Sequence, residues 1–106
     1  MIYFYKIIKE VNMAKKILMF YLSDCPHCVG AMRYEDELRR ENPAYRALQI
    51  ERIDEAEDPK TADEYDYYWV PTYYVDGVKA HEGRNTKADV RKVFDAAAGL
   101  NGGNVF

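Results

Sequence analysis

One apolar run constrains the fold of this chain more than any other feature of its sequence. Residues 17–22 are six apolar residues without polar alternation, which is typical of a strand buried on both faces in the middle of a sheet. Ser23 and Asp24 interrupt the run and are good helix N-caps, and Pro26 suits a first helical turn. The sequence therefore predicts a central strand that passes directly into a helix, which can continue to Glu41.

The segments that follow predict an α/β fold with the element order β-α-β-α-β-β-α. After the first helix we expect strand 47–54, helix 58–65, strand 71–75, strand 78–81 and a last helix between Thr86 and Gly99. The first crossover makes the first two strands parallel, and the last two strands form an antiparallel hairpin at the edge. The expected fold is a central mixed four-stranded sheet with helices on both faces.

The chain is expected to form one domain with a peripheral segment at each end. A length of 106 residues is typical of a single domain. Residues 1–15 are expected to be an N-terminal extension, either a helix or a strand. Alternatively, translation begins at Met13, and residues 1–12 have no role in the fold. Residues 16–99 are expected to form the domain, and residues 100–106 a flexible tail.

Charge and hydropathy exclude two classes of partner. The chain has 15 Lys and Arg against 18 Asp and Glu, a net charge of −3, which gives no basic field for nucleic acid. No apolar run approaches the roughly 18–20 residues that cross a bilayer. The N-terminal stretch is interrupted by charges and lacks a cleavage site. We therefore expect a cytoplasmic monomer without nucleic-acid or membrane partners.

The only two cysteines, Cys25 and Cys28, lie where the central strand passes into the helix. A disulfide between them would close a very short loop, so its structural value is small. At the helix N-terminus, unpaired N–H groups and the helix dipole stabilise the thiolate of Cys25. Cys28 should be more buried and stay a thiol until it resolves a mixed disulfide on Cys25. Pro26 and His27 are expected to tune the pair.

Two other uses of the cysteine pair remain open as alternatives. In a zinc-binding module, His27 and His81 would join the two thiolates, but structural zinc sites usually need a second close pair of ligands, which the sequence lacks. No metal site is therefore predicted. In a redox-responsive binding module, the pair would switch the affinity for a partner without turnover.

From Lys16 to about Ala98, the chain resembles the thioredoxin superfamily. The segments that carry the resemblance are the strand ending in Cys25-Pro26-His27-Cys28, the helix 58–65, Val70-Pro71-Thr72 at the start of a strand, the turn Asp76-Gly77, and Gly83 before the last helix. A lone C-x-x-C motif is a weak signal, but its combination with the Val-Pro-Thr segment and the hairpin is specific. The resemblance implies a thioredoxin fold.

The resemblance also implies a thiol-disulfide oxidoreductase, with Cys25 as nucleophile and Cys28 as resolving cysteine. It implies that Pro71 is a cis-proline beside Cys25 and that the backbone of Val70 pairs with the substrate. The candidate substrate-binding residues are Trp69, Val70, Pro71 and Thr72.

Departures from the thioredoxin pattern indicate an atypical, glutaredoxin-sized member. Thioredoxins proper usually have an acidic residue six positions before the first cysteine. Met19 holds that position, so the buried carboxylate that would accept the proton of Cys28 is expected to be missing. The Cys-Pro-X-Cys pattern looks more like glutaredoxins, but residues 82–85 lack the pattern that holds glutathione. No cofactor is expected, and glutathione stays open as a co-substrate.

The expected partners follow from the same resemblance. A protein or low-molecular-weight disulfide would be the substrate, and a reductase or glutathione would be the electron donor.

Two further groups of side chains have a structural interpretation. Six aromatic residues lie around Pro71: Tyr65, Tyr67, Tyr68, Trp69, Tyr73 and Tyr74. We favour core and sheet packing for them, because strand alternation turns about half inward, over an apolar shelf for a substrate peptide. The acidic run from Glu51 to Asp58 is interpreted as a solvated strand end and helix cap.

Overall fold

The structure, a computed structural model, describes residues 14–100. The expectations for residues 1–13 and 101–106 lie outside the described residues. The division into an extension, a domain and a tail therefore stays a prediction.

The predicted element order is confirmed, with one short helix added. The elements are β1 (Ile17–Tyr21), α2 (Pro26–Glu41), the 3-10 helix η1 (Pro43–Tyr45), β2 (Ile50–Asp54), α3 (Pro59–Ala62), β3 (Thr72–Val75), β4 (Val78–Glu82) and α4 (Lys87–Ala98). No helix among the described residues is long and apolar enough to cross a membrane.

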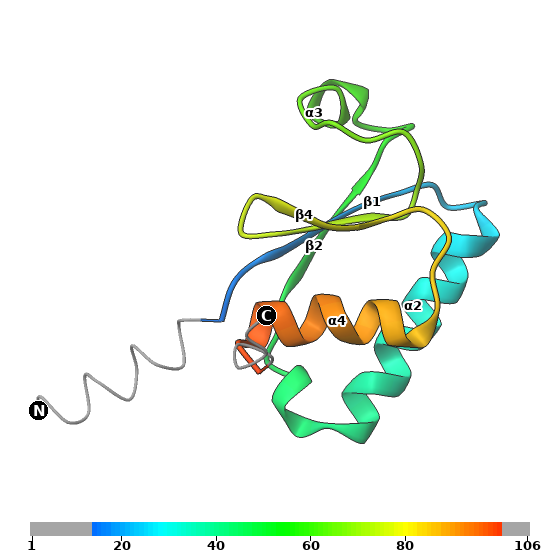
Figure 1. Ribbon diagram of the computed structural model, residues 1–106. Helices are drawn as coiled ribbons and strands as arrows, with labels where there is room; N and C mark the ends of the chain where they lie inside the picture. The colour runs from blue at the N-terminus through cyan, green and yellow to red at the C-terminus, as the bar shows by residue number, and fades with distance from the viewer. Residues whose placement is uncertain (1–13, 101–106) are drawn as a thin grey trace, which may run out of the picture.

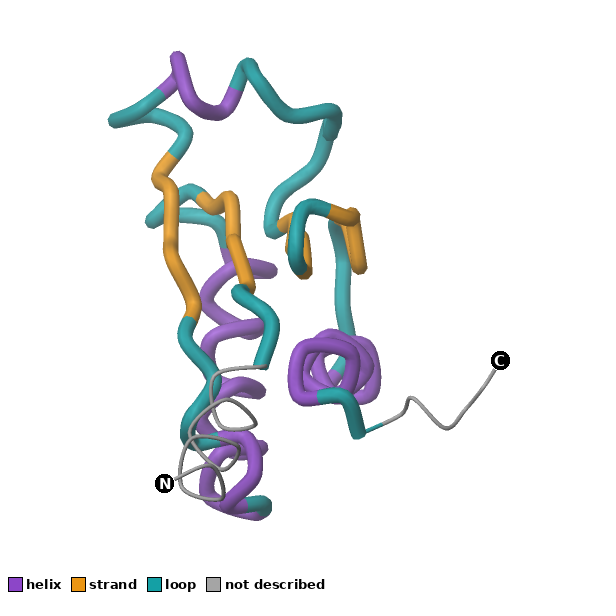
Figure 2. Tube along the Cα trace, turned by 90° about the vertical axis from the view of Figure 1, so that its left-hand side faces the viewer, coloured by secondary structure: helices purple, strands orange, loops and turns teal. Residues whose placement is uncertain are grey.

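The four strands form one mixed sheet in the order β2-β1-β3-β4. β1 is central, parallel to β2 and antiparallel to β3, and β3 and β4 form the antiparallel hairpin at the edge. Helices α2 and α4 lie on one side of the sheet and α3 on the other (Figure 1), and the same layering is visible after a quarter turn (Figure 2). The predicted central strand and edge hairpin are confirmed.

Two apolar clusters fill the spaces on either side of the sheet. Ile17 and Met19 pack with α2 and α4, whereas Phe20 packs with Ala62 under α3. Because successive side chains of a strand point to opposite faces, one short apolar strand supplies both clusters. This double burial explains why the run 17–22 lacks polar alternation.

The first helix begins differently from the prediction. Cys25, not Ser23 or Asp24, is the N-cap of α2, and its Sγ accepts a hydrogen bond from the backbone N–H of Cys28 at 3.3 Å. Ser23 and Asp24 lie in the turn that follows β1. This turn is closed by a hydrogen bond from the N–H of Cys25 to the carbonyl of Leu22, at 3.2 Å. The thiol therefore takes the capping role that a hydroxyl or carboxylate usually has.

Two other elements are shorter than predicted by three residues or more. β2 begins at Ile50 rather than residue 47, because Leu48 folds back and its N–H bonds to the carbonyl of Tyr45. α3 ends at Ala62 rather than Tyr65, and the ring of Tyr65 instead packs 4.8 Å from that of Phe20.

The last helix matches its local signals. Thr86 and Asp89 form a reciprocal capping box at the start of α4, and Gly99 ends the helix in the left-handed conformation.

Candidate active site

The two cysteines differ in their exposure to solvent. Cys25 is partly buried at the N-terminus of α2, whereas Cys28 is fully buried one turn later, and both are free thiols. The Sγ of Cys25 also lies 3.8 Å from the carbonyl oxygen of Val70. The sulfur of Cys25 is therefore accessible to a substrate, whereas the sulfur of Cys28 is accessible only to the residues around it.

The environment of Cys28 favours the protonated thiol. Burial raises the pKa of Cys28 to about 12, and the Cys25 sulfur and the Glu55 carboxylate raise it further. A hydrogen bond with the backbone of Leu22 lowers this pKa, but its effect is smaller than that of burial. Cys28 is therefore a weak nucleophile in the reduced protein.

The segment 69–72 lies beside Cys25 and is held by its own hydrogen bonds. The Val70–Pro71 peptide bond is cis. The carbonyl of Pro71 accepts from the N–H of Gly83 at 2.8 Å, and the hydroxyl of Thr72 donates to the carbonyl of Trp69 at 2.5 Å. Pro71 and Thr72 are buried, so of these residues Val70 presents its carbonyl to Cys25 and Trp69 presents its side chain to solvent.

Glu82 fixes the loop before this segment, a role that the sequence did not reveal. Its carboxylate accepts hydrogen bonds from the backbone N–H groups of Tyr68 and Trp69, at 2.5 and 2.9 Å, and pairs with Lys79 at 2.7 Å. The Lys79 ammonium and these two N–H groups lower the pKa of Glu82 to about 2. The backbone of the loop is thus pinned to β4.

The aromatic residues around Pro71 divide between core and surface. Tyr65, Tyr67, Tyr73 and Tyr74 pack in the two clusters, as the packing interpretation predicts. That interpretation is wrong for Tyr68 and Trp69, which are 85% and 70% exposed. They lie in the loop that Glu82 holds, outside any strand, so strand alternation does not apply to them.

Asn85 connects the cysteine motif to the loop between β4 and α4. Its side-chain amide donates to the carbonyl of His27 at 3.2 Å and to that of Gly83 at 3.4 Å. Pro26 is the first residue of α2, and both Pro26 and His27 are exposed. Sequence reasoning missed Asn85, because nothing local marks a contact across 58 positions.

A buried carboxylate does lie beside β1, although Met19 is not acidic. Glu35 is 1% exposed, and its carboxylate pairs with Arg52 at 2.7 Å and accepts from the hydroxyl of Tyr73 at 2.5 Å. Arg52 also lies 2.9 Å from the sulfur of Met19. This carboxylate comes from α2 rather than from the strand and pairs with Arg52 and Tyr73. The expectation that the carboxylate that would accept the proton of Cys28 is missing stays a prediction.

The position of Glu35 in the sequence carried a signal that could have located it. The buried residues of α2 are Cys28, Ala31, Glu35 and Leu38, which is the spacing of one helix face. A charged residue within such an apolar stripe predicts a buried ion pair.

The residues proposed for the zinc alternative do not gather. Within residues 14–100, no group of three or more His, Cys, Asp or Glu side chains is placed to hold a metal ion. The ring of His81 instead contacts the carbonyl of Arg84 at 2.8 Å.

Comparison with known proteins supplies one clear relative. No protein family model matches the chain. The sequence is 38% identical over 72 residues to a thioredoxin of Methanocaldococcus jannaschii, which covers 68% of this chain and 82% of that protein.

Solved structures show the same fold at lower sequence identity. The oxidised thioredoxin of Plasmodium falciparum superimposes with a TM-score of 0.61 at 15% identity, covering 92% of both chains. A mutant thioredoxin of Halobacterium salinarum gives 0.59 at 18% identity, covering 86% of this chain and 82% of that one. At these identities the likeness concerns the fold alone.

Proposed function

The chain belongs to the thioredoxin family, and we propose that it is a thiol-disulfide oxidoreductase that acts through Cys25 and Cys28. The observation that carries the proposal is the pairing of an accessible and a buried sulfur at one helix start, with the Val70 carbonyl 3.8 Å from the outer sulfur. Family membership supports the reaction class, and the geometry supports the division of roles.

In the first half of the reaction, the thiolate of Cys25 attacks one sulfur of a substrate disulfide. A mixed disulfide forms, and the other substrate sulfur leaves as a thiolate that takes up a proton. The backbone N–H of Cys28 donates a hydrogen bond to the Sγ of Cys25 at 3.3 Å, at the N-terminus of α2.

In the second half, Cys28 loses its proton and attacks the sulfur of Cys25. The second substrate thiolate leaves, so one substrate disulfide becomes two thiols while the two cysteines become a disulfide. A reductase or glutathione would return the pair to its reduced form. Because Cys28 is buried, this attack is confined to a sulfur held at Cys25.

The segment 69–72 is the proposed substrate-binding edge. Val70 lies next to Cys25, and the exposed ring of Trp69 offers contact area at low entropic cost. Pro71 and Thr72 are buried and would act by holding this backbone in place.

Substitution of each cysteine tests the division of roles. Cys25→Ser should abolish the reduction of insulin and of a small-molecule disulfide, and Cys28→Ser should accumulate a mixed disulfide that mass spectrometry detects. Full turnover by Cys25→Ser would refute the assignment. Repeated turnover of a disulfide substrate also distinguishes this function from a redox-responsive binding module. Such a module would change its affinity for a partner without regenerating the dithiol at a useful rate.

His27 and Pro26 are proposed to tune the redox potential of the pair. A protonated imidazole beside Cys25 would stabilise the reduced thiolate, so His27→Pro should make the pair more reducing. A titration against glutathione that gives an unchanged or higher potential would remove His27 from this role. The electron donor, the cytoplasmic location, the monomeric state and the glutaredoxin-like subtype stay predictions.

A further inference from the structure

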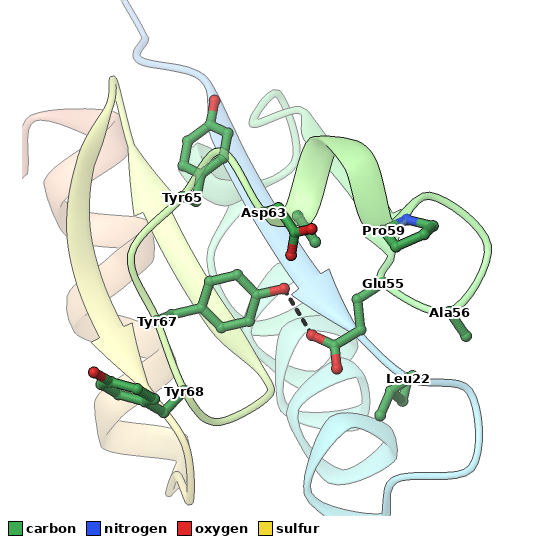
Figure 3. A pocket seen from close by; sticks show the side chains of 9 residues that line it. Leu22, Glu55, Ala56, Pro59, Asp63, Tyr65, Tyr67 and Tyr68 are labelled. Carbon is green, nitrogen blue, oxygen red and sulfur yellow. Dashed lines mark hydrogen bonds between the residues drawn. The ribbon is translucent and has the colours of Figure 1, made fainter.

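A cavity of about 550 Å³ opens at the carboxyl end of β1, where the chain leads to the cysteine motif. Leu22, at the end of β1, forms one side, and Glu55, Asp63 and three tyrosines form the others (Figure 3). The cavity thus lies between the end of the central strand, the loop before α3 and the loop after it. The proposed reaction uses residues 69–72 of the second loop, and these residues do not line the cavity.

Part of the cavity wall is aromatic, and the ring of Tyr67 in it is held by two contacts. Tyr65, Tyr67 and Tyr68 line it. The ring of Tyr67 stacks on Phe20 with centroids 4.8 Å apart, and its hydroxyl donates to Oε1 of Glu55 at 2.7 Å. Tyrosine rings and phenol oxygens both attract cations, whereas an anion would meet their negative faces.

Two carboxylates in the cavity lack a cationic partner among the described residues. Those of Glu55 and Asp63 both point toward the phenol of Tyr67 (Figure 3). Neither forms an ion pair with another residue in the range 14–100. Two uncompensated carboxylates next to aromatic rings favour an ammonium or guanidinium group.

The segment 54–66, which surrounds the cavity, is strongly acidic and adds to the negative potential there. Residues 54–66 contain a single basic residue, Lys60. Their acidic residues are Asp54, Glu55, Glu57, Asp58, Asp63, Glu64 and Asp66. Because the whole chain has a net charge of only −3, much of its negative charge is concentrated here, which steers cationic partners to this end of the molecule.

The cavity and the cysteine motif share Leu22. This residue lines the cavity, and its carbonyl accepts the N–H of Cys25 at 3.2 Å. The Glu55 carboxylate also contributes to the raised pKa of Cys28, which is consistent with a short separation. A polypeptide whose disulfide reaches Cys25 can therefore place a neighbouring side chain in the cavity.

We propose that this cavity is a subsite for a lysine or arginine side chain close to the disulfide of a polypeptide substrate. The proposal rests on the proposed function and specifies its substrate class. It also adds a role to the acidic run 51–58, which we interpret as a solvated strand end and helix cap and in which Asp58 does cap α3. Glu55 and Asp63 supply the charge, and the tyrosines supply the surface that the side chain covers.

The test compares two synthetic disulfide peptides that differ only by lysine or glutamine beside the cysteine. The measured quantity is the ratio of their kcat/KM values at low salt. We expect the lysine peptide to be preferred about fivefold to tenfold by the unaltered protein. The double variant Glu55→Gln with Asp63→Asn should lower the ratio to about two, because the residual field of the segment remains. The Glu55→Gln change keeps an oxygen that can accept the Tyr67 hydroxyl.

A matched control removes the same charge outside the cavity. Glu57→Gln with Glu64→Gln changes two charges in the same acidic segment, at residues that do not line the cavity, and should keep most of the preference. An equal loss of preference in both double variants would show a general field and overturn the subsite. Equal kcat/KM values for the two peptides in the unaltered protein would also overturn it.

A binding measurement separates failure of the subsite from failure of the redox function. The lysine peptide with its cysteines replaced by serine should shift the backbone amide resonances of residues 62–68 in the unaltered protein, and much less in Glu55→Gln with Asp63→Asn. If neither disulfide peptide is reduced but these shifts appear, the oxidoreductase proposal fails and the cation site stands. If the shifts are absent, the cation site fails whether or not reduction occurs.

Discussion

The Sγ of Cys25 and the carbonyl oxygen of Val70 lie 3.8 Å apart, although 45 positions separate the two residues in the chain. The pairing of β1 with β3 produces this contact. Phe20 near the end of β1 is opposite Thr72 at the start of β3, so the segment before β3 meets the turn after β1. A slip of one residue in this register would turn every side chain of β3 to the other face and separate the two groups.

The two cysteines should react with alkylating agents at very different rates. Iodoacetamide at pH 7.5 should label Cys25 of the folded, reduced protein and leave Cys28 unlabelled, because Cys28 is fully buried and its pKa is raised to about 12. Both should be labelled in 6 M guanidinium chloride. Peptide mapping by mass spectrometry gives the two extents, and equal labelling of the folded protein would contradict the burial of Cys28.

The buried thiol should also make the reduced protein less stable at alkaline pH. The pKa of Cys28 in the folded state, about 12, lies above the ordinary value of roughly 8.5. Its contribution is therefore complete below about pH 8.5 and decreases as the pH rises toward 12, by about 1.4 kcal/mol per pH unit. Urea unfolding at pH 7, 9 and 10 measures the decrease.

Cys28→Ala is the comparison for this slope, since the tyrosines remain in both proteins and Cys28 is a minor cause of the raised pKa of Tyr73. The variant should lose less stability between pH 8.5 and 10 than the unaltered reduced protein. Parallel stability curves for the two proteins would show that Cys28 ionises equally well in the folded and unfolded states.

Removal of Arg52 should destabilise the fold strongly. Within residues 14–100, Arg52→Ala leaves the buried carboxylate of Glu35 with only the hydroxyl of Tyr73 as its hydrogen-bond donor. We expect a cost of about 3 kcal/mol in the free energy of unfolding. Arg33→Ala is the control, because Arg33 pairs with Glu37 at 3.9 Å on the surface and should cost less than about 0.5 kcal/mol. If urea unfolding gave similar free-energy losses for Arg52→Ala and Arg33→Ala, the burial of Glu35 would not make its ion pair more important than a surface pair.

Loss of Glu82 should weaken the loop that carries Trp69, in a way that depends on pH. Glu82→Ala removes the acceptor of two backbone N–H groups and of Lys79, and should cost about 1 kcal/mol at pH 7. Because the folded-state pKa of Glu82 is lowered to about 2, this stabilisation is complete above its ordinary value of roughly 4.3 and decreases as the pH falls toward 2.

The check on Glu82 is a pair of urea titrations, at pH 7 and at pH 3. The difference between the unaltered protein and Glu82→Ala should be smaller at pH 3. Glu51→Ala serves as the control, since its partner Lys16 lies on the surface. A cost for Glu82→Ala no larger than that for Glu51→Ala at pH 7 would contradict the anchoring role.

Two glycines should respond to alanine in opposite directions. Gly30 lies inside α2, and an added Cβ would meet nothing within 4 Å, so Gly30→Ala should stabilise the protein by about 0.5–1 kcal/mol. Gly83 has a φ of +86°, and its Cβ would lie 3.4 Å from that of Trp69, so Gly83→Ala should destabilise it by at least ~1 kcal/mol. Thermal and urea unfolding measure both, and changes of the same sign would refute the comparison.

The sequence by itself determined the features whose causes are local. The apolar run 17–22 predicted the central strand, because a strand buried on both faces needs apolar residues throughout. Thr86, Asp89 and Gly99 predicted both ends of α4, since each acts on backbone groups within one turn. The position of Cys25 and Cys28 at the start of a helix followed from the strand and the proline beside them.

Only the tertiary structure decided which side chains from distant segments meet. Glu35 is buried because Arg52 and Tyr73 reach it from two different strands, and Asn85 reaches His27 across 58 positions. The exposure of Trp69 depends on Glu82 in β4, and the cavity beside Leu22 depends on how two loops lie over the end of β1. Propensity and capping act over a few residues, whereas these contacts depend on strand register and packing, which single positions in the sequence do not encode.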